Sequence, residues 1–299
     1  MNSLQLPRAF FMMKKMHFFQ AVLLICTMAI IHQARGQTGD PAFVRWVDTG
    51  EQMGHLDTSI QSYRHPAGRE VHLVAAIHVA DAAYYRLLNE YFAKIQCVLY
   101  EMVKDEETHP TVISESSHPV SQLQSGMKAL LGLTHQLDEM DYTSPHFVHA
   151  DLDPATFAQL QGQKGESFFT LAIQAYLQEK QLMARGQLKG FSGFDLLMAM
   201  KSGRPDHALK WMMARQMTAM ESMLGGIDQG MDGKGSVILR GRNDKAFEVL
   251  AEKFKEGKRQ IAIFYGAGHM PDMHQRLIQQ GFIRSGEQWL TAWDLKPSP

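Results

Sequence analysis

The chain has 299 residues, and its 30 basic and 31 acidic side chains give a formal net charge of −1 at pH 7. No basic patch stands out from this balance, so we expect no nucleic-acid partner. The length suits one domain with a large hydrophobic core, or a core domain with an insertion.

The amino terminus has the pattern of an export signal. Lys14 and Lys15 form a positive segment, residues 18–31 are apolar and uncharged, and Ala34 and Gly36 supply small residues for cleavage. An apolar run of about 14 residues is shorter than the roughly 20 that span a bilayer. We therefore predict a signal peptide at 1–36 and a single mature domain at 37–299, exported to the periplasm or the cell exterior. An uncleaved leader that anchors the chain to a membrane is the alternative.

Cysteine usage excludes an internal disulfide in the mature chain. The sequence has two cysteines, and Cys26 lies in the predicted leader. Cys97 is then alone in an apolar stretch, so we interpret it as a buried, unreactive thiol. A catalytic cysteine is the weaker alternative.

The first third of the mature chain reads as strands and one helix. We expect strands at 42–47, 58–63 and 70–77, the last two joined as a hairpin by the Pro- and Gly-containing residues 65–69. Asp81 is placed to cap a helix at 82–94, and an apolar strand at 96–101 follows. The order strand, helix, strand indicates a parallel βαβ unit.

The middle of the chain is predominantly helical in pattern. After a polar loop at 104–119, we expect a helix at 120–137, a break at 138–145, a short apolar piece at 146–151 and a helix that starts at Asp153-Pro154. Further helical segments follow at 166–187, 194–200 and 204–224. We interpret residues 120–224 as a helical insertion that covers the carboxyl edge of the sheet.

The last part returns to the sheet. Residues 225–235 contain five glycines and predict a mobile connection or lid hinge; a phosphate cradle is disfavoured because no Gly-Lys-Ser/Thr follows. We expect a helix at 236–255, a strand at 261–265 buried on both faces, a glycine turn at 266–268, a helix at 272–280 capped by Gly281, and strands at 282–284 and 288–294. The predicted fold class is α/β, with a central mixed, largely parallel sheet flanked by helices.

Three predicted strands each end in a residue that binds metals or moves protons. His78, Glu101 and His269 occupy these positions, and ligands bind at the carboxyl ends of strands in open α/β sheets. Two imidazoles and a carboxylate form a plausible first shell for a divalent metal, which would activate a bound water. Glu101 is either the third ligand or the general base. The competing interpretation is that each histidine is simply a hydrogen-bonded structural residue.

Two further groups are weaker candidates. Arg242 carries a permanent fork-shaped charge suited to a carboxylate or oxyanion, and Asn243 can donate to an oxyanion or fix a histidine tautomer. A solvated helix face explains the same pair. His149 and Asp151, two residues apart, would share one side of an extended chain and could add to the site.

At these residues the chain resembles the TraB/PrgY/TIKI family, which is related to ChaN-like and erythromycin-esterase-like proteins. The matching motifs are 266–269 (GAGH), Glu101 in VLYEM and the Arg242-Asn243 pair, whereas residues 75–78 (AAIH) have Ala75 where the family has glycine. The resemblance covers about 57–101 and 236–295.

The resemblance implies a metal-dependent hydrolase that cleaves a peptide or amide bond with a metal-activated water. His78, His269 and Glu101 would then be metal ligands, and Glu101, Arg242 and Asn243 would serve catalysis; manganese, cobalt, zinc and iron are the candidate metals. Because relatives differ in chemistry, a non-catalytic haem- or peptide-binding protein that uses the same pocket is the alternative.

Overall fold

The computed structural model describes residues 41–105, 131–164, 180, 183–184, 191–223 and 237–296. The predicted leader, the glycine-rich connection and most of the helices predicted at 120–137 and 166–187 lie outside these residues. In the described part of the chain, no helix is both long enough and apolar enough to cross a membrane.

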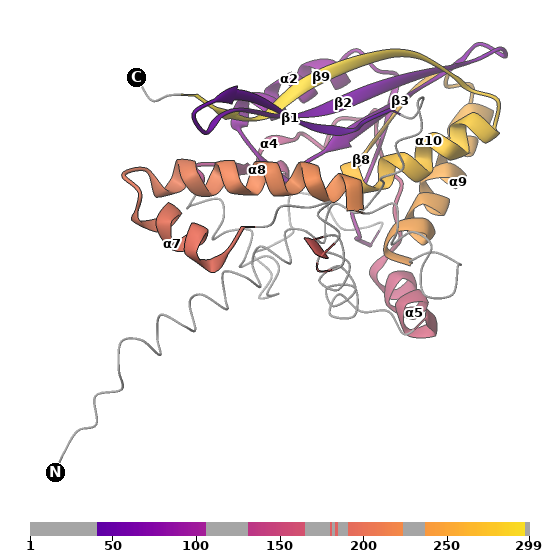
Figure 1. Ribbon diagram of the computed structural model, residues 1–299. Coiled ribbons are helices and arrows are strands. Elements are labelled where there is room, and N and C mark those ends of the chain that lie inside the picture. Colours follow the sequence, from indigo (N-terminus) through magenta and orange to yellow (C-terminus); the bar gives the residue numbers. More distant parts are fainter. Residues whose placement is uncertain are drawn as a thin grey trace.

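One seven-stranded mixed sheet organises the described residues, so the predicted α/β class is confirmed (Figure 1). Its strands run in the order β1-β2-β3-β8-β5-β7, and β9 pairs with β2. From β3 to β7 all neighbours are parallel, whereas β2 is antiparallel to each of its three partners. The strands are β1 (Val44–Gly50), β2 (Met53–His65), β3 (Arg69–Ala76), β5 (Cys97–Tyr100), β7 (Phe147–His149), β8 (Gln260–Gly266) and β9 (Ile283–Leu295).

The predicted hairpin is confirmed, but the prediction of two separate strands near the carboxyl terminus is wrong. β2 and β3 pair antiparallel around the turn after His65. The sequence suggested separate strands at 282–284 and 288–294, whereas β9 is one strand that also includes Gly286, paired with Ser62 of β2. Because β2 is 13 residues long, it offers backbone partners along the whole of β9, and these offset the weak strand preference of glycine.

The predicted parallel βαβ unit is present, although its two strands are not neighbours. Helix α2 (Ala82–Phe92) connects β3 to β5, and β8 lies between these strands. Asp81 occupies the N-cap position but makes no side-chain cap, which corrects the prediction. Its carboxylate instead accepts from Lys210 Nζ at 2.8 Å and from the backbone N–H of Asp294 at 2.7 Å.

The middle of the chain contains a strand that was not predicted as one. The short apolar segment predicted at 146–151 contains strand β7, which pairs with β5 at the edge of the main sheet. In place of the end of the predicted helix at 120–137, Thr134–His135 form β6, which pairs with β4 (Val79–Ala80), and α4 (Gln136–Glu139) follows. The region of the predicted insertion is therefore not wholly helical.

Three helices of this region match their predictions. They are α5 (Pro154–Lys164), α7 (Gly193–Lys201) and α8 (Pro205–Met223). α8 packs against β1, β2 and β9, and α5 packs against the π-helical turn Val237–Gly241. That the whole insertion covers the carboxyl edge of the sheet stays a prediction.

Two predicted site residues, Arg242 and His269, lie where helices begin in the carboxyl-terminal part of the chain. The π-helical turn leads into α9 (Arg242–Lys255), so the helix predicted at 236–255 is divided just before Arg242. β8 passes through a 3₁₀ turn (Ala267–His269) into α10 (Met270–Gln279), where Pro271 suits the first turn of a helix.

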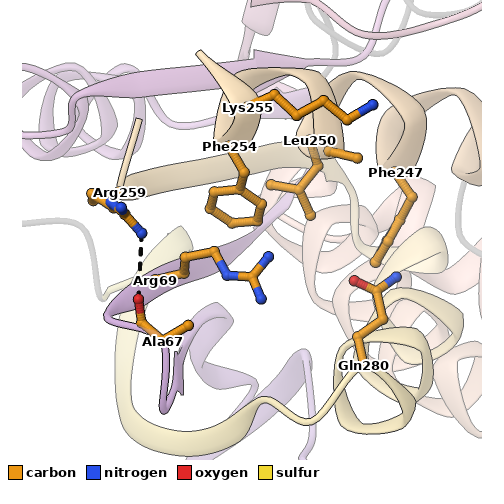
Figure 2. A pocket seen from close by; sticks show the side chains of 9 residues that line it. Ala67, Arg69, Phe247, Leu250, Phe254, Lys255, Arg259 and Gln280 are labelled. Carbon is orange, nitrogen blue, oxygen red and sulfur yellow. Dashed lines mark hydrogen bonds between the residues drawn. The ribbon is translucent and has the colours of Figure 1, made fainter. Parts of the chain in front are cut away.

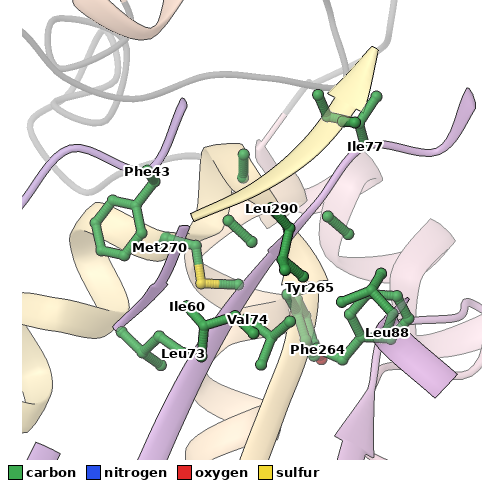
Figure 3. Close-up of a cluster of buried hydrophobic side chains, with 14 of the residues drawn as sticks. Phe43, Ile60, Leu73, Val74, Ile77, Leu88, Phe264, Tyr265, Met270 and Leu290 are labelled. Carbon is green, nitrogen blue, oxygen red and sulfur yellow. The ribbon is translucent and has the colours of Figure 1, made fainter. Parts of the chain in front are cut away.

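β8 lies at the centre of the hydrophobic core (Figure 3). Phe264 and Tyr265 are fully buried, which confirms a strand buried on both faces. Phe264 contacts Phe92 of α2 at 4.9 Å between ring centroids, whereas Tyr265, the next residue, points to the opposite face. Cys97 is also buried, as predicted.

Candidate functional site

The carboxyl ends of four parallel strands bring the candidate residues together. Glu101 directly follows β5, His78 follows β3, Asp151 follows β7 and His269 follows β8. The register aligns Ala76 with Gly266 and Tyr100 with Phe264, so these ends meet at one edge of the sheet. The predicted convergence of strand ends is therefore present in the fold.

Glu101 is the centre of the site. Its Oε2 accepts a hydrogen bond of 2.6 Å from the Gly266 N–H, and its Oε1 lies 2.8 Å from Nη2 of Arg242. His269 Nε2 lies 3.6 Å from the same Oε1. Burial alone would raise the pKa of Glu101, but nearby positive charge, chiefly that of the Arg242 guanidinium, outweighs it and lowers the pKa to about 2. The carboxylate is therefore ionised at neutral pH.

Arg242 bridges two buried carboxylates. Its Nε donates to Asp151 Oδ1 at 2.9 Å, and its Nη2 contacts both Asp151 Oδ2 and Glu101. Burial would lower the pKa of the guanidinium, but the two carboxylates raise it further above its usual range. Two carboxylates against one guanidinium leave the cluster with an excess negative charge, which favours a cation as an additional partner.

His269 is held as a neutral ring of defined tautomer. Its Nδ1 lies 2.6 Å from Asn243 Oδ1, and the Asn243 amide nitrogen donates to Asp272 at 2.7 Å. Because an amide oxygen only accepts, Nδ1 carries the proton and Nε2 presents its lone pair towards Glu101. Burial lowers the pKa of His269 to about 4, although Glu101 opposes this effect, so the ring is uncharged at neutral pH.

His78 has the same arrangement at the end of the neighbouring strand. Its Nδ1 lies 3.1 Å from Gln136 Oε1, while the Gln136 amide nitrogen donates to the Tyr142 hydroxyl at 2.7 Å. The Gln136 backbone N–H also binds the carbonyl of His78, which fixes the two residues together. His78 therefore donates from Nδ1, which leaves Nε2 as the ring nitrogen that is not engaged by Gln136, and the side chain is partly exposed.

Tyr265 lies beside His269 and ties β7 to β8. Its hydroxyl donates to the carbonyl of Ala150, the residue before Asp151. Its ring meets that of His269 edge-on, with centroids 5.2 Å apart. Tyr265 therefore helps to position both the carboxylate that binds Arg242 and the imidazole beside Glu101.

The sequence named most of the residues in this cluster and left two roles open for Asn243. Asn243 is fully buried, with its amide occupied by His269 and Asp272, so it fixes a tautomer, one of the two roles considered for it. Of the weaker pair, Asp151 joins the site, whereas His149 Nε2 contacts the carbonyl of Met102 at 2.6 Å.

Three supporting residues were missed. Gln136, Tyr142 and Asp272 orient the two histidines, but each belongs to a segment whose pattern gives no sign of chemistry. They are brought to the site by tertiary contacts, so no motif in the sequence marks them.

The donor types at the site fit a divalent metal. Metal-binding histidines commonly donate their second ring N–H to an oxygen, as His78 and His269 do here, and Glu101 supplies an ionised carboxylate. Within the described residues, no group of three His, Cys, Asp or Glu side chains is arranged to hold an ion. A metal at Glu101 would compete with Arg242 for Oε1.

Alanine in place of the family's first glycine introduces no backbone strain. Ala75 is buried within β3 and pairs with Tyr265 in regular register. Among the described residues, Glu51 and Gln52 are the non-glycine residues with positive φ. His78 therefore does not need a glycine at position 75 to reach the site.

No protein-family model, curated protein or solved structure matches this chain. The resemblance to the TraB/PrgY/TIKI family thus rests on the motifs of the sequence itself.

Proposed function

We propose that the protein is a metal-dependent hydrolase of the TraB/PrgY/TIKI type that cleaves peptide or amide bonds outside the cytoplasm. The observation that supports it most is the matched pair of histidines. His78 and His269 both lie near the ionised Glu101, and each has its Nδ1 bound to a side-chain amide oxygen, so that Nε2 is the ring nitrogen left for a metal. A divalent metal bound there would acidify a water and polarise the carbonyl to be attacked.

The low pKa of Glu101 favours a ligand role over a general-base role. A base with a pKa near 2 has little tendency to take a proton at neutral pH. As a ligand, the same carboxylate provides a permanent negative charge. Arg242 would release one oxygen of Glu101 when the metal binds, keep its two contacts with Asp151, and bind the substrate carboxylate or developing oxyanion.

Metal binding is the first test. Purified protein is incubated with manganese, cobalt, zinc or iron(II), and metal per chain is measured by mass spectrometry after desalting. We expect about one metal per chain, with loss in His269→Ala and His78→Ala. The control is His146→Ala, because His146 precedes the amino end of β7, away from the site. Equal metal content in all variants, or none in any, would contradict the proposal.

Turnover is the second test. The metal-loaded protein is screened against peptide and amide substrates, with and without a chelator. Glu101→Gln keeps the size of the side chain but loses its charge, so it should bind metal more weakly and hydrolyse more slowly. If the protein instead binds haem with a visible absorbance band and cleaves nothing, the non-catalytic alternative replaces this proposal.

A further inference from the structure

A second concave site lies at the opposite end of the same parallel strands. A cavity of about 410 Å³ is formed where β3 and β8 begin, between the carboxyl-terminal part of α9 and the end of α10 (Figure 2). β8 has seven residues, so at about 3.3 Å per residue the two ends of the strand lie roughly 20 Å apart. None of the candidate site residues lines this cavity.

The cavity has three cationic side chains on its wall. They are Arg69 at the start of β3, Lys255 at the end of α9 and Arg259 just before β8. Within the described residues, no carboxylate forms an ion pair with any of the three. The Arg259 guanidinium donates to the carbonyl of Ala67 at 3.3 Å. As far as the structure describes the chain, the positive charge of this wall is not balanced by an ion pair.

The Arg69 guanidinium is held in place, but not every one of its N–H donors has an acceptor. Its guanidinium carbon lies 5.1 Å from the ring centre of Phe254 and 5.8 Å from that of Phe282. Its Nη2 contacts His65 at 3.3 Å, and its Nε is buried without an acceptor. In Figure 2 the guanidinium points into the middle of the pocket, beneath Phe254. A guanidinium that is held in place, with one N–H that has no acceptor among the described residues, is suited to bind a carboxylate.

Apart from Gln280, the side chains on the remainder of the wall are apolar. Phe247, Leu250 and Phe254 lie along one side of α9 and face the pocket, and Gln280 lies across from them (Figure 2). The volume is at the lower end of the range of about 300–1,000 Å³ seen for small-molecule sites. An inorganic anion would leave this apolar surface uncovered, whereas an uncharged hydrocarbon would leave the cations unpaired.

We propose that this pocket binds a small amphipathic carboxylate, with the carboxylate on Arg69 and the apolar body against Phe247, Leu250 and Phe254. A fatty acid and a peptide carboxyl terminus with an apolar last residue share this chemistry. The pocket is separate from the candidate hydrolase site, so its occupancy does not depend on the proposed function.

Binding is measured by calorimetry and by ligand-observed NMR with the purified protein. The probes are octanoate for a fatty acid, N-acetyl-phenylalanine for a peptide terminus, octanol as a neutral analogue and inorganic phosphate as an anion without an apolar body. We expect saturable binding of at least one carboxylate probe, with octanol and phosphate at least about tenfold weaker because each lacks one half of the recognition. Which carboxylate binds more tightly identifies the source.

Variants decide whether the binding is at this pocket. Arg69→Met should weaken the carboxylate probe by about tenfold or more, and Lys255→Met, at an exposed position that does not threaten folding, should weaken it several-fold. Arg64→Met is the matched control, since Arg64 lies on the same hairpin but pairs with Glu70 outside the pocket. His269→Ala should bind the probe as the wild type does.

Three outcomes would overturn the assignment. The first is that no carboxylate probe binds at millimolar concentration. The second is that phosphate or octanol binds as tightly as the carboxylates. The third is that neither Arg69→Met nor Lys255→Met weakens binding, with thermal melts confirming that the variants are folded.

Discussion

The bridge between Glu101, Arg242 and Asp151 makes Arg242 a sensitive point for stability. The Arg242 side chain is 11% exposed and that of Asp151 is fully buried. Arg242→Gln removes the cation and leaves two carboxylates close together in the interior. Removing one partner of a buried ion pair costs about 3–5 kcal/mol, a large part of the roughly 5–15 kcal/mol that stabilises a domain.

Urea denaturation followed by circular dichroism measures this effect. With a slope of about 2–3 kcal/mol per molar urea, the midpoint should fall by about 1.5 M. Glu248→Gln is the control on the same helix, because the exposed pair Lys245–Glu248 should contribute less than about 1 kcal/mol.

A double-mutant cycle separates the interaction from a general defect. Asp151→Asn in the Arg242→Gln background removes one of the two unpaired carboxylates, so the double variant should be more stable than the sum of the single effects by about 1–3 kcal/mol. If Arg242→Gln costs no more than Glu248→Gln, or if the two site substitutions are additive, the buried bridge does not hold the site together as described.

Three other predictions concern residues away from this bridge. Burial lowers the pKa of His72 in the folded protein below the value of about 6.5 expected in the unfolded chain. Between these two pKa values the unfolded chain binds more protons than the folded protein, so stability should decrease as the pH falls below about 6.5. In His72→Gln, the slope of the unfolding free energy against pH should be smaller by up to about 1.4 kcal/mol per pH unit. Urea titrations at several pH values that give the same slope for this variant and the wild type would refute the prediction. Gly54→Ala would place Cβ 2.2 Å from the Val47 carbonyl at φ +149, so thermal melts should show a loss above about 3 kcal/mol, while Gly286→Ala, with nothing nearer than 3.7 Å, should cost little. Cys97 should react with a maleimide only after unfolding, because burial keeps it inaccessible and raises the pKa of its thiol; mass spectrometry that finds native Cys97 labelled at the rate of a free thiol would contradict this.

The sequence by itself determined the local elements and the strand ends of the site. Continuous apolar runs mark β3, β5 and β8 because strands buried on both faces must be apolar throughout. Parallel strands then place the residues that follow them at one edge of the sheet, which is why His78, Glu101 and His269 were correctly expected to converge. These inferences need only the periodicity and direction of single segments.

Only the tertiary structure decided which residues complete the site. β7 is three residues long and has too little pattern to be identified, yet its pairing with β5 brings Asp151 to Arg242. Gln136 reaches His78 across 58 positions of the chain, because β6 pairs with β4 and positions α4. Such long-range pairings also determine the histidine tautomers, the buried ion pairs and the position of the cations in the second pocket. They are stabilised by burial of residues that are far apart in the sequence, and a short stretch of sequence does not reveal this burial.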